Sequence, residues 1–279
     1  MRSRCRPRST KPMVDSMTRR VGVEHVMGTV ISIDLRDPEV EAGLVETAFD
    51  WLRQVDVRFS PYKPQSEISR LGRGEVTVEE CHADVGDVLS LCEDMHRETH
   101  GVFNAWRCRP DGRLDPSGVV KGWAVERAAG ILMLGGARNF CINAGGDVVI
   151  RGEPEPGRAW RIGIRHPNDA RAVAAVVQGT DLAVATSGAY ERGNHVVDAR
   201  TGIPSRTLLS LTVAGPSLTI ADAYATAGFA MGRAGVAWVA ARPGYAPFAV
   251  TDSGRVQYSD AFADLLVSSD PPVSSLTGR

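Results

Sequence analysis

The chain has 279 residues, of which 43% are hydrophobic and 23% charged, and its formal net charge is −1. This composition supplies enough apolar material for a folded core and excludes disorder over the whole length. No apolar run approaches the roughly 18 to 20 residues of a membrane-spanning helix. The near-neutral charge argues against a nucleic-acid-binding protein that relies on bulk attraction to phosphate.

The charge is unevenly distributed along the chain. Residues 1–20 carry a net charge of +6, which leaves −7 for residues 21–279. No apolar stretch of about 7 to 15 residues follows these basic residues, so the segment lacks the features of a secretory signal. We expect residues 1–20 to be a disordered basic leader, or to precede a true start at Met13 or Met17; an arm for nucleic acid or anionic lipid is the alternative.

The cysteines favour a reducing compartment. There are five, at positions 5, 81, 92, 108 and 141, and no two have the C-x-x-C spacing. Such a pattern is typical of reduced thiols rather than of a disulfide framework or a zinc ribbon. We therefore expect a cytoplasmic location.

Helices and strands are predicted from the apolar spacing. After a mixed pattern from about Val21, residues 30–35 alternate as a strand. Helical spacing follows over 40–55, over 85–101 and from Ser117, a candidate cap, to about Gly135. The later chain is richer in strands, at 140–143, 148–151, 160–165, 173–178, 182–186, 195–197, 209–214 and 247–251, with helices at 219–232 and 234–242.

These elements predict an α+β fold that combines helices with an antiparallel-rich sheet. No long linker or internal repeat divides them. We expect one domain over residues 21–267, followed by a loose Ser- and Pro-rich tail over 268–279.

Two strand ends carry residues suited to binding a ligand. Residues 144–147 (AGGD) allow positive φ angles and a close approach of ligand, although a plain hairpin turn explains them equally. Thr186, Ser187 and Gly188 can offer hydroxyl and backbone donors to phosphate, or form an ordinary turn. His195 and Asp198 follow, and a histidine beside a strand is often structural.

Two helix segments add charged and oxygen-bearing groups. Asp222 and Thr226 are four residues apart on one helix face among alanines, a pattern that suits a hard ion such as Mg²⁺, although an acid in a first helical turn also complements the helix dipole. Asp115 precedes a helix and Lys121 lies one turn inside it. Neither the P-loop nor the G-x-G-x-x-G pattern occurs.

A zinc site is a competing interpretation of one helix. Cys92, His96 and His100 recur every four residues, and Cys81 and His82 are near in sequence. Against it, Cys92 belongs to the apolar face and the two histidines lie among charged residues.

Taken in order, seven segments resemble the ApbE family of flavin transferases over about residues 27–231. They are 27–29 (MGT), 59–69 (FSPYKPQSEIS), 115–122 (DPSGVVKG), 143–147 (NAGGD), 185–188 (ATSG), 195–202 (HVVDARTG) and 221–226 (ADAYAT). Each is weak alone, and their order makes the resemblance specific.

The resemblance implies an enzyme that uses Mg²⁺ to transfer FMN from FAD to a Thr or Ser hydroxyl of an acceptor flavoprotein, with release of AMP. It implies flavin contacts at Met27, Tyr62, Asp115 and Lys121. It implies metal binding by Asp222, Thr226 and the carbonyl of Gly118, and a place for His195 beside the reacting phosphate.

The chemistry of such a reaction agrees with these residues. Attack on a pyrophosphate needs neutralisation of charge, which Mg²⁺, Lys121 and backbone donors can supply, and a base or orienting group such as His195. Tyr62 and the pair Phe103 and Trp106 can stack on a cofactor ring.

The chain also departs from the family pattern. Asn104 stands where many relatives have Asp, Ala199 where Pro is frequent, and Ala225 where some have a further acid. The alternatives are therefore a Mg²⁺-dependent FAD pyrophosphatase that gives FMN and AMP, and a non-catalytic FAD-binding protein.

Overall fold

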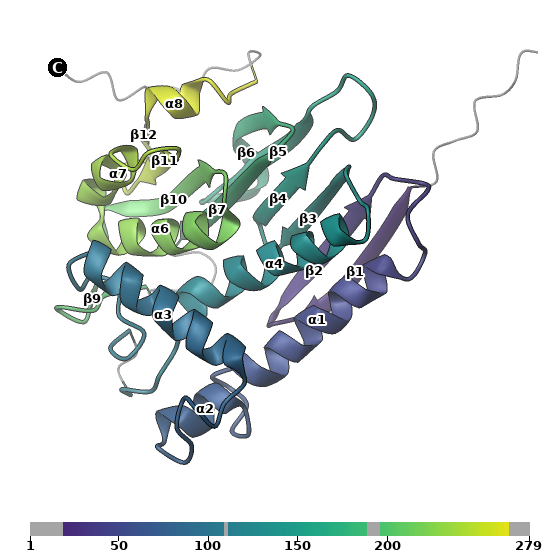
Figure 1. Cartoon of the computed structure of the whole chain (residues 1–279). Coiled ribbons are helices and arrows are strands. Elements are labelled where there is room, and N and C mark those ends of the chain that lie inside the picture. The colour runs from purple at the N-terminus through teal and green to yellow at the C-terminus, as the bar shows by residue number, and fades with distance from the viewer. Residues whose placement is uncertain (1–18, 109–110, 189–195, 268–279) are drawn as a thin grey trace, which may run out of the picture.

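The computed structural model describes residues 19–108, 111–188 and 196–267. Within them, helices cover one face of an eight-stranded antiparallel sheet, and a two-stranded hairpin covers part of the other face (Figure 1). The α+β fold predicted from the sequence is confirmed.

The sheet has the strand order β1-β2-β3-β4-β7-β10-β11-β12, and every neighbouring pair is antiparallel. Its strands are β1 (Arg20–Val26), β2 (Thr29–Leu35), β3 (Phe140–Ala144), β4 (Asp147–Arg151), β7 (Leu182–Gly188), β10 (Leu208–Gly215), β11 (Ala246–Thr251) and β12 (Val256–Tyr258). Two smaller pairs are β5 (Trp160–His166) with β6 (Asp169–Gly179), and β8 (Val197–Asp198) with β9 (Ile203–Pro204).

Within the described residues, five longer helices match the predicted ones, and two further helices are short. They are α1 (Leu44–Phe59), α2 (Glu67–Gly72), α3 (Ala83–Glu98), α4 (Ser117–Leu134), α6 (Leu218–Met231), α7 (Arg233–Ala240) and α8 (Asp260–Ala263). In Figure 1, α1, α4 and α6 lie along the same face of the sheet. The short elements α2, α8 and β12 were not predicted, because so few residues show no periodicity.

The central strands are buried on both faces. In β4, Val149 packs with the helices, whereas Val148 and Ile150 pack with the β5–β6 hairpin. The same alternation holds in β7, where Ala185 faces the helices and Val184 the hairpin. Two buried faces explain why these strands are continuous apolar runs in the sequence.

Strand β1 was missed because its pattern is inverted. Its apolar residues Val21 and Val23 are exposed, whereas Gly22 and Glu24 lie toward α1. A Cβ on Gly22 would lie 2.6 Å from the Phe49 ring, and Glu24 pairs with Arg53 of α1 at 2.5 Å. Periodicity fails here because a close helix contact and an ion pair replace apolar packing.

One predicted boundary and one predicted cap were wrong. The first helix begins at Leu44 rather than near Val40, which is buried in the preceding turn and accepts a hydrogen bond from the Arg20 side chain through its carbonyl. Ser117 does not cap α4. Asp115 accepts hydrogen bonds from the backbone N–H of Ser117, at 3.0 Å, and from its hydroxyl.

The division into leader, domain and tail stays a prediction, because residues 1–18 and 268–279 lie outside the described residues. Arg20 begins β1, and Arg19 pairs with Asp34 at 3.0 Å. None of the helices in the described ranges combines the length and apolarity that a bilayer crossing requires.

Helices α4 and α6 cross closely at Gly122. At Gly122, an added Cβ would lie 2.5 Å from the Leu218 carbonyl oxygen and 2.8 Å from the Asp222 Cβ. The backbone N–H of Gly122 donates to Asp222 Oδ2 at 2.8 Å. The two backbones can approach this closely only because residue 122 has no side chain.

We predict that Gly122→Ala forces the helices apart and lowers the free energy of unfolding by about 1 to 3 kcal/mol. The matched control is Gly130→Ala in the same helix, where no atom lies within 4 Å of the added Cβ. It should raise stability by about 0.5 to 1 kcal/mol through helix propensity. Urea unfolding measures both, and equal effects of the two substitutions would contradict the close crossing.

Candidate active site

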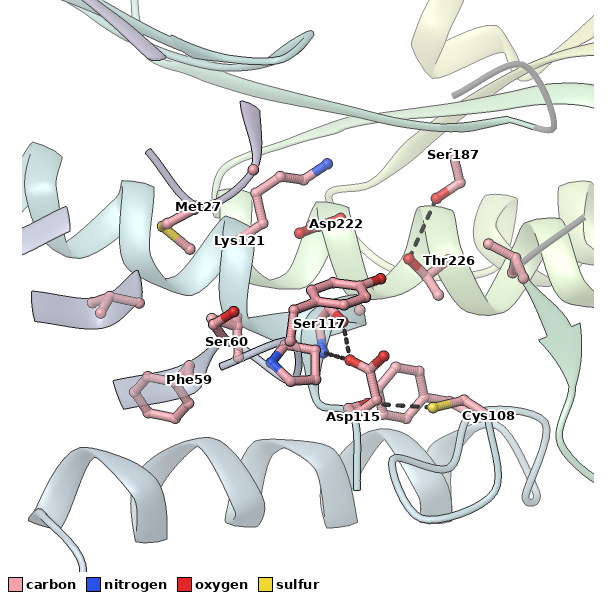
Figure 2. Close-up of a pocket in the computed structure, with 18 of the residues that line it drawn as sticks. Met27, Phe59, Ser60, Cys108, Asp115, Ser117, Lys121, Ser187, Asp222 and Thr226 are labelled. Carbon is pink, nitrogen blue, oxygen red and sulfur yellow. Dashed lines mark hydrogen bonds between the residues drawn. The ribbon is translucent and has the colours of Figure 1, made fainter. Parts of the chain in front are cut away.

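One cavity of about 790 Å³ opens where the β1–β2 turn, the end of α1, the start of α4, the end of β7 and the face of α6 meet (Figure 2). It collects nearly all the described residues predicted for the site. Those that line it are Met27, Tyr62, Asp115, Gly118, Lys121, Thr186, Ser187, Gly188, Asp222 and Thr226.

Helix α6 presents its two polar groups to this cavity. Ser217 caps the helix by accepting from the N–H of Ile220, and the residues between Asp222 and Thr226 are buried. Asp222 is only 4% exposed and is held by the N–H of Gly122. The i, i+4 spacing therefore puts a carboxylate and a hydroxyl on the cavity side, one turn apart.

The two hydroxyls at the end of β7 point to opposite sides of the strand, as successive strand residues do. Ser187 Oγ lies 3.3 Å from Thr226 Oγ1 on α6. Thr186 Oγ1 instead lies 2.8 Å from Thr212 Oγ1 on β10. The predicted pair of hydroxyl donors is thus split, with Ser187 beside α6.

Lys121 is fixed by Asp147, which belongs to a segment that the sequence analysis singled out for ligand binding but to which it gave no partner. Its Nζ lies 2.7 Å from Asp147 Oδ2, and the Asp147 side chain is 2% exposed. Asp147 Oδ1 also accepts from the N–H of Thr186 at 3.0 Å. Asp147 is not part of the cavity wall, so it acts as a positioning residue that holds Lys121 and the end of β7.

The glycines before Asp147 form the β3–β4 turn, so the hairpin interpretation of residues 144–147 is correct. Gly145 and Gly146 have φ angles of 63° and 107°. A Cβ on Gly145 would lie 2.2 Å from Thr29 Oγ1. Neither of these glycines lines the cavity. The turn places the buried Asp147 at the start of β4.

Asp115 lies two residues before α4. Its carboxylate caps the helix through Ser117, and its backbone carbonyl accepts from the Cys108 thiol at 3.3 Å. Because Asp115 and Lys121 flank the first turn of α4, the cavity wall combines an acid, a lysine and a helix N-terminus.

The aromatic groups differ in position. Tyr62 lies at the cavity rim and is 69% exposed, and the nearly buried Phe103 forms part of the wall. Trp106 is 50% exposed and is not among the lining residues. The Asn104 side chain accepts from the N–H of Trp106 at 2.9 Å and forms a local turn there. A cofactor contact at Trp106 stays a prediction.

His195 lies outside the described residues, so its predicted role is untested. The described residues on either side of that segment, Gly188 and Val196, both line the cavity. Asp198 pairs with Arg200 at 2.7 Å, and this contact holds the pKa of the Asp198 carboxyl below its ordinary value.

The oxygen groups around α6 fit a hard divalent cation. Asp222 supplies a carboxylate, Thr226 a hydroxyl and Gly118 a carbonyl. A Cβ on Gly118 would lie 2.8 Å from the Phe103 ring and 3.1 Å from Thr226 Cγ2, so glycine lets the first turn of α4 lie against α6. One carboxylate with neutral oxygens is the donor set that Mg²⁺ uses when phosphates and water complete its shell.

Ala225 does not weaken this set of oxygen ligands, because its side chain is fully buried in the core and does not line the cavity. The alanine therefore removes no group from the cavity wall.

The zinc interpretation of α3 fails in the described part of the chain, which holds no group of three or more His, Cys, Asp or Glu side chains placed to bind a metal. His96 Nδ1 lies 3.0 Å from the Phe103 carbonyl oxygen. Burial raises the pKa of the Cys92 thiol to about 12, which keeps it protonated at neutral pH.

Comparisons with known proteins identify the family of this chain. The model of the ApbE family matches residues 27–109 and 105–248, and the chain belongs to this family. Three relatives are named FAD:protein FMN transferase. The one from Vibrio cholerae is 34% identical, over 44% of this chain and 40% of its own length, and the one from Haemophilus influenzae is 27% identical, over 77% of this chain and 81% of its own length. The one from Escherichia coli is 33% identical, over 57% of this chain and 49% of its own length. The chain thus spans less than half of the length of two of these relatives.

Solved structures share the fold. The flavin transferase ApbE from Vibrio cholerae has a TM-score of 0.76 at 24% identity, covering 89% of this chain and all of that one. The ApbE protein from Thermotoga maritima has a TM-score of 0.79 at 22% identity, covering 90% and 100%.

We predict that Asp147→Asn weakens binding of an anionic ligand such as FAD in the cavity, because the uncharged amide no longer holds Lys121 in place. Breaking this pair, one partner of which is partly exposed, should cost about 1 to 3 kcal/mol of stability. Asp252→Asn is the control, since Asp252 pairs with Arg233 on the surface at 2.8 Å and should cost less than about 1 kcal/mol. Flavin fluorescence titration and urea unfolding report both quantities, and wild-type FAD affinity in Asp147→Asn would refute the positioning role.

Proposed function

We propose that this protein transfers FMN from FAD to a Thr or Ser hydroxyl of an acceptor flavoprotein. Its relatives are named FAD:protein FMN transferase, which supports the transfer of FMN to a protein. The observation that carries the proposal is the convergence on one cavity of Lys121 with the oxygens of Asp222, Thr226 and Gly118. A cationic group opposite a set of oxygen ligands is what binding of a pyrophosphate together with a divalent cation requires.

The reaction joins the acceptor oxygen to the phosphorus of the FMN half of FAD. The bond from that phosphorus to the oxygen bridging the two phosphates breaks, AMP leaves with that oxygen, and the acceptor hydroxyl loses its proton. Bound Mg²⁺ would neutralise phosphate charge and help orient the leaving group.

The chain's own residues have separate tasks in this proposal. Lys121 holds phosphate oxygens at a position fixed by Asp147, and Ser187 and the N–H groups near Gly188 can donate to the same phosphates. Met27, Tyr62 and Asp115 would contact the flavin half, since all three line the cavity. Asp222, Thr226 and the Gly118 carbonyl would hold the cation.

We assign the base to His195 on its chemistry and its place in the chain. An imidazole titrates near neutral pH and can accept the hydroxyl proton. The cytoplasmic location expected from the sequence also stays a prediction.

The proposal predicts a specific mass change. Incubation of the protein with FAD, Mg²⁺ and candidate acceptor flavoprotein domains should add one FMN to an acceptor, seen by intact-mass spectrometry, with one AMP released per adduct. AMP release that does not depend on an acceptor would favour the FAD pyrophosphatase, and FAD binding without AMP would favour the non-catalytic binding protein. Either result would overturn the proposed transfer.

A second prediction concerns the cation. Asp222→Asn keeps the shape of the side chain and an oxygen for the Gly122 N–H, so stability should change little, while loss of the charge should raise the Mg²⁺ concentration for half-maximal transfer about tenfold or more. Ser210→Ala, a buried hydroxyl on β10 outside the cavity, is the control. An unchanged Mg²⁺ dependence in Asp222→Asn would exclude this carboxylate as a ligand.

A further inference from the structure

Strand β1 is the edge of the main sheet, and its outer side is open in the described part of the chain. It pairs only with β2, and no described segment lies beyond it in the strand order. The opposite edge strand, β12, has only three residues, and its Tyr258 ring packs against Phe262 of α8. The sheet therefore has one long edge available for another strand.

The register of the β1–β2 hairpin determines which backbone groups this edge offers. The strands are joined by Met27 and Gly28, with φ angles of 56° and 72°, so Val26 and Thr29 form the closing hydrogen-bonded pair. Alternate residues of β1 then bond to β2. The N–H and C=O groups of Val21, Val23 and His25 point outward, and no contact within the described residues uses them.

The side chains at this edge suit an apolar extended segment. Val21 and Val23 are 51% and 60% exposed on the sheet face that turns away from α1, and Val30 on β2 is 54% exposed beside them. Charged groups of β1 are engaged elsewhere, since Glu24 pairs with Arg53 and the Arg20 side chain donates to the Pro38 carbonyl. An edge strand with unpaired backbone groups, and with its charges engaged elsewhere, can pair with an extended segment of another molecule.

The edge leads directly to the candidate active site. Residues 25–28, the end of β1 and its turn, line the same cavity as Lys121 and Asp222. A strand added along β1 therefore passes the cavity mouth where β1 ends. A hydroxyl carried just beyond that strand would lie near the cavity to which the proposed function assigns the pyrophosphate.

We propose that the acceptor protein docks by adding an extended segment, about six residues long and with alternating apolar side chains, to the edge of β1. This inference rests on the proposed function, because only transfer to a macromolecular hydroxyl requires a docking strand. The edge hydrogen bonds supply affinity, and Val21 and Val23 supply side-chain contacts. A second copy of this chain is the competing occupant, and such pairing would place the copy across the cavity mouth.

The test uses Val23→Pro in the full chain. Proline removes the outward N–H of residue 23 without removing a bond to β2, and prolines are tolerated on edge strands for this reason. Val23→Thr is the matched control, because it keeps the N–H and the β-branched shape. The acceptor is the flavoprotein domain that gains FMN in the mass assay.

We expect Val23→Pro to raise KM for this acceptor about three- to tenfold, the effect of one lost backbone hydrogen bond, with FAD affinity and kcat unchanged. Val23→Thr should stay within about twofold of wild type. An unchanged KM in a Val23→Pro protein with wild-type FAD affinity would overturn docking at β1. A change in sedimentation with unchanged KM would assign the edge to self-association instead.

A measurement on the wild-type protein tests the same docking proposal and does not depend on whether the variant folds. Amide hydrogen exchange at Val21, Val23 and His25 should slow at least about tenfold when the acceptor domain is added, while exchange in α7 stays constant. No slowing at saturating acceptor overturns the proposal. Absence of any FMN adduct with wild-type protein would instead refute the proposed function itself, so the two failures are distinguishable.

Discussion

The close crossing of α4 and α6 at Gly122 is the constraint on which the site depends. The Gly122 N–H both satisfies Asp222 and fixes the register of one helix against the other. Lys121 precedes Gly122 by one residue on α4 and is directed toward Asp147. Gly118 lies one turn before Gly122 and packs against Thr226. A shift of one residue in either helix would separate the lysine from the oxygen cluster, so the packing of two apolar helices sets the distance between two polar groups.

The sheet supports this crossing from the other side. Asp147 starts β4 directly after a turn that needs two positive φ angles, and it reaches both Lys121 on α4 and the N–H of Thr186 on β7. Ser187 then lies beside Thr226. Buried carboxylates with several partners hold their neighbours in single positions, and here Asp147 on the sheet and Asp222 on α6 do so.

The sequence predicted the long helices, the central strands and the grouping of most site residues, because apolar periodicity and an ordered set of motifs carry that information. It did not predict β1, whose inward positions are Gly22 and Glu24, nor the role of Asp147, whose partners are far away in the chain. The Ser117 cap was wrong because the Ser117 hydroxyl donates to Asp115, while the N–H groups of Val119 and Val120 donate to the Pro116 carbonyl. Such outcomes depend on tertiary contacts that no local pattern records.

Since the chain beyond residue 20 carries a net charge of −7, a pyrophosphate must be held by local groups rather than by the overall field. The central claim is that one cavity binds FAD and a divalent cation together. Calorimetric titration of FAD with and without Mg²⁺ tests it most directly. The account predicts that FAD binds at least about tenfold more tightly with Mg²⁺ present, and that FAD tightens Mg²⁺ binding by the same factor. Equal FAD affinity in both conditions would contradict it.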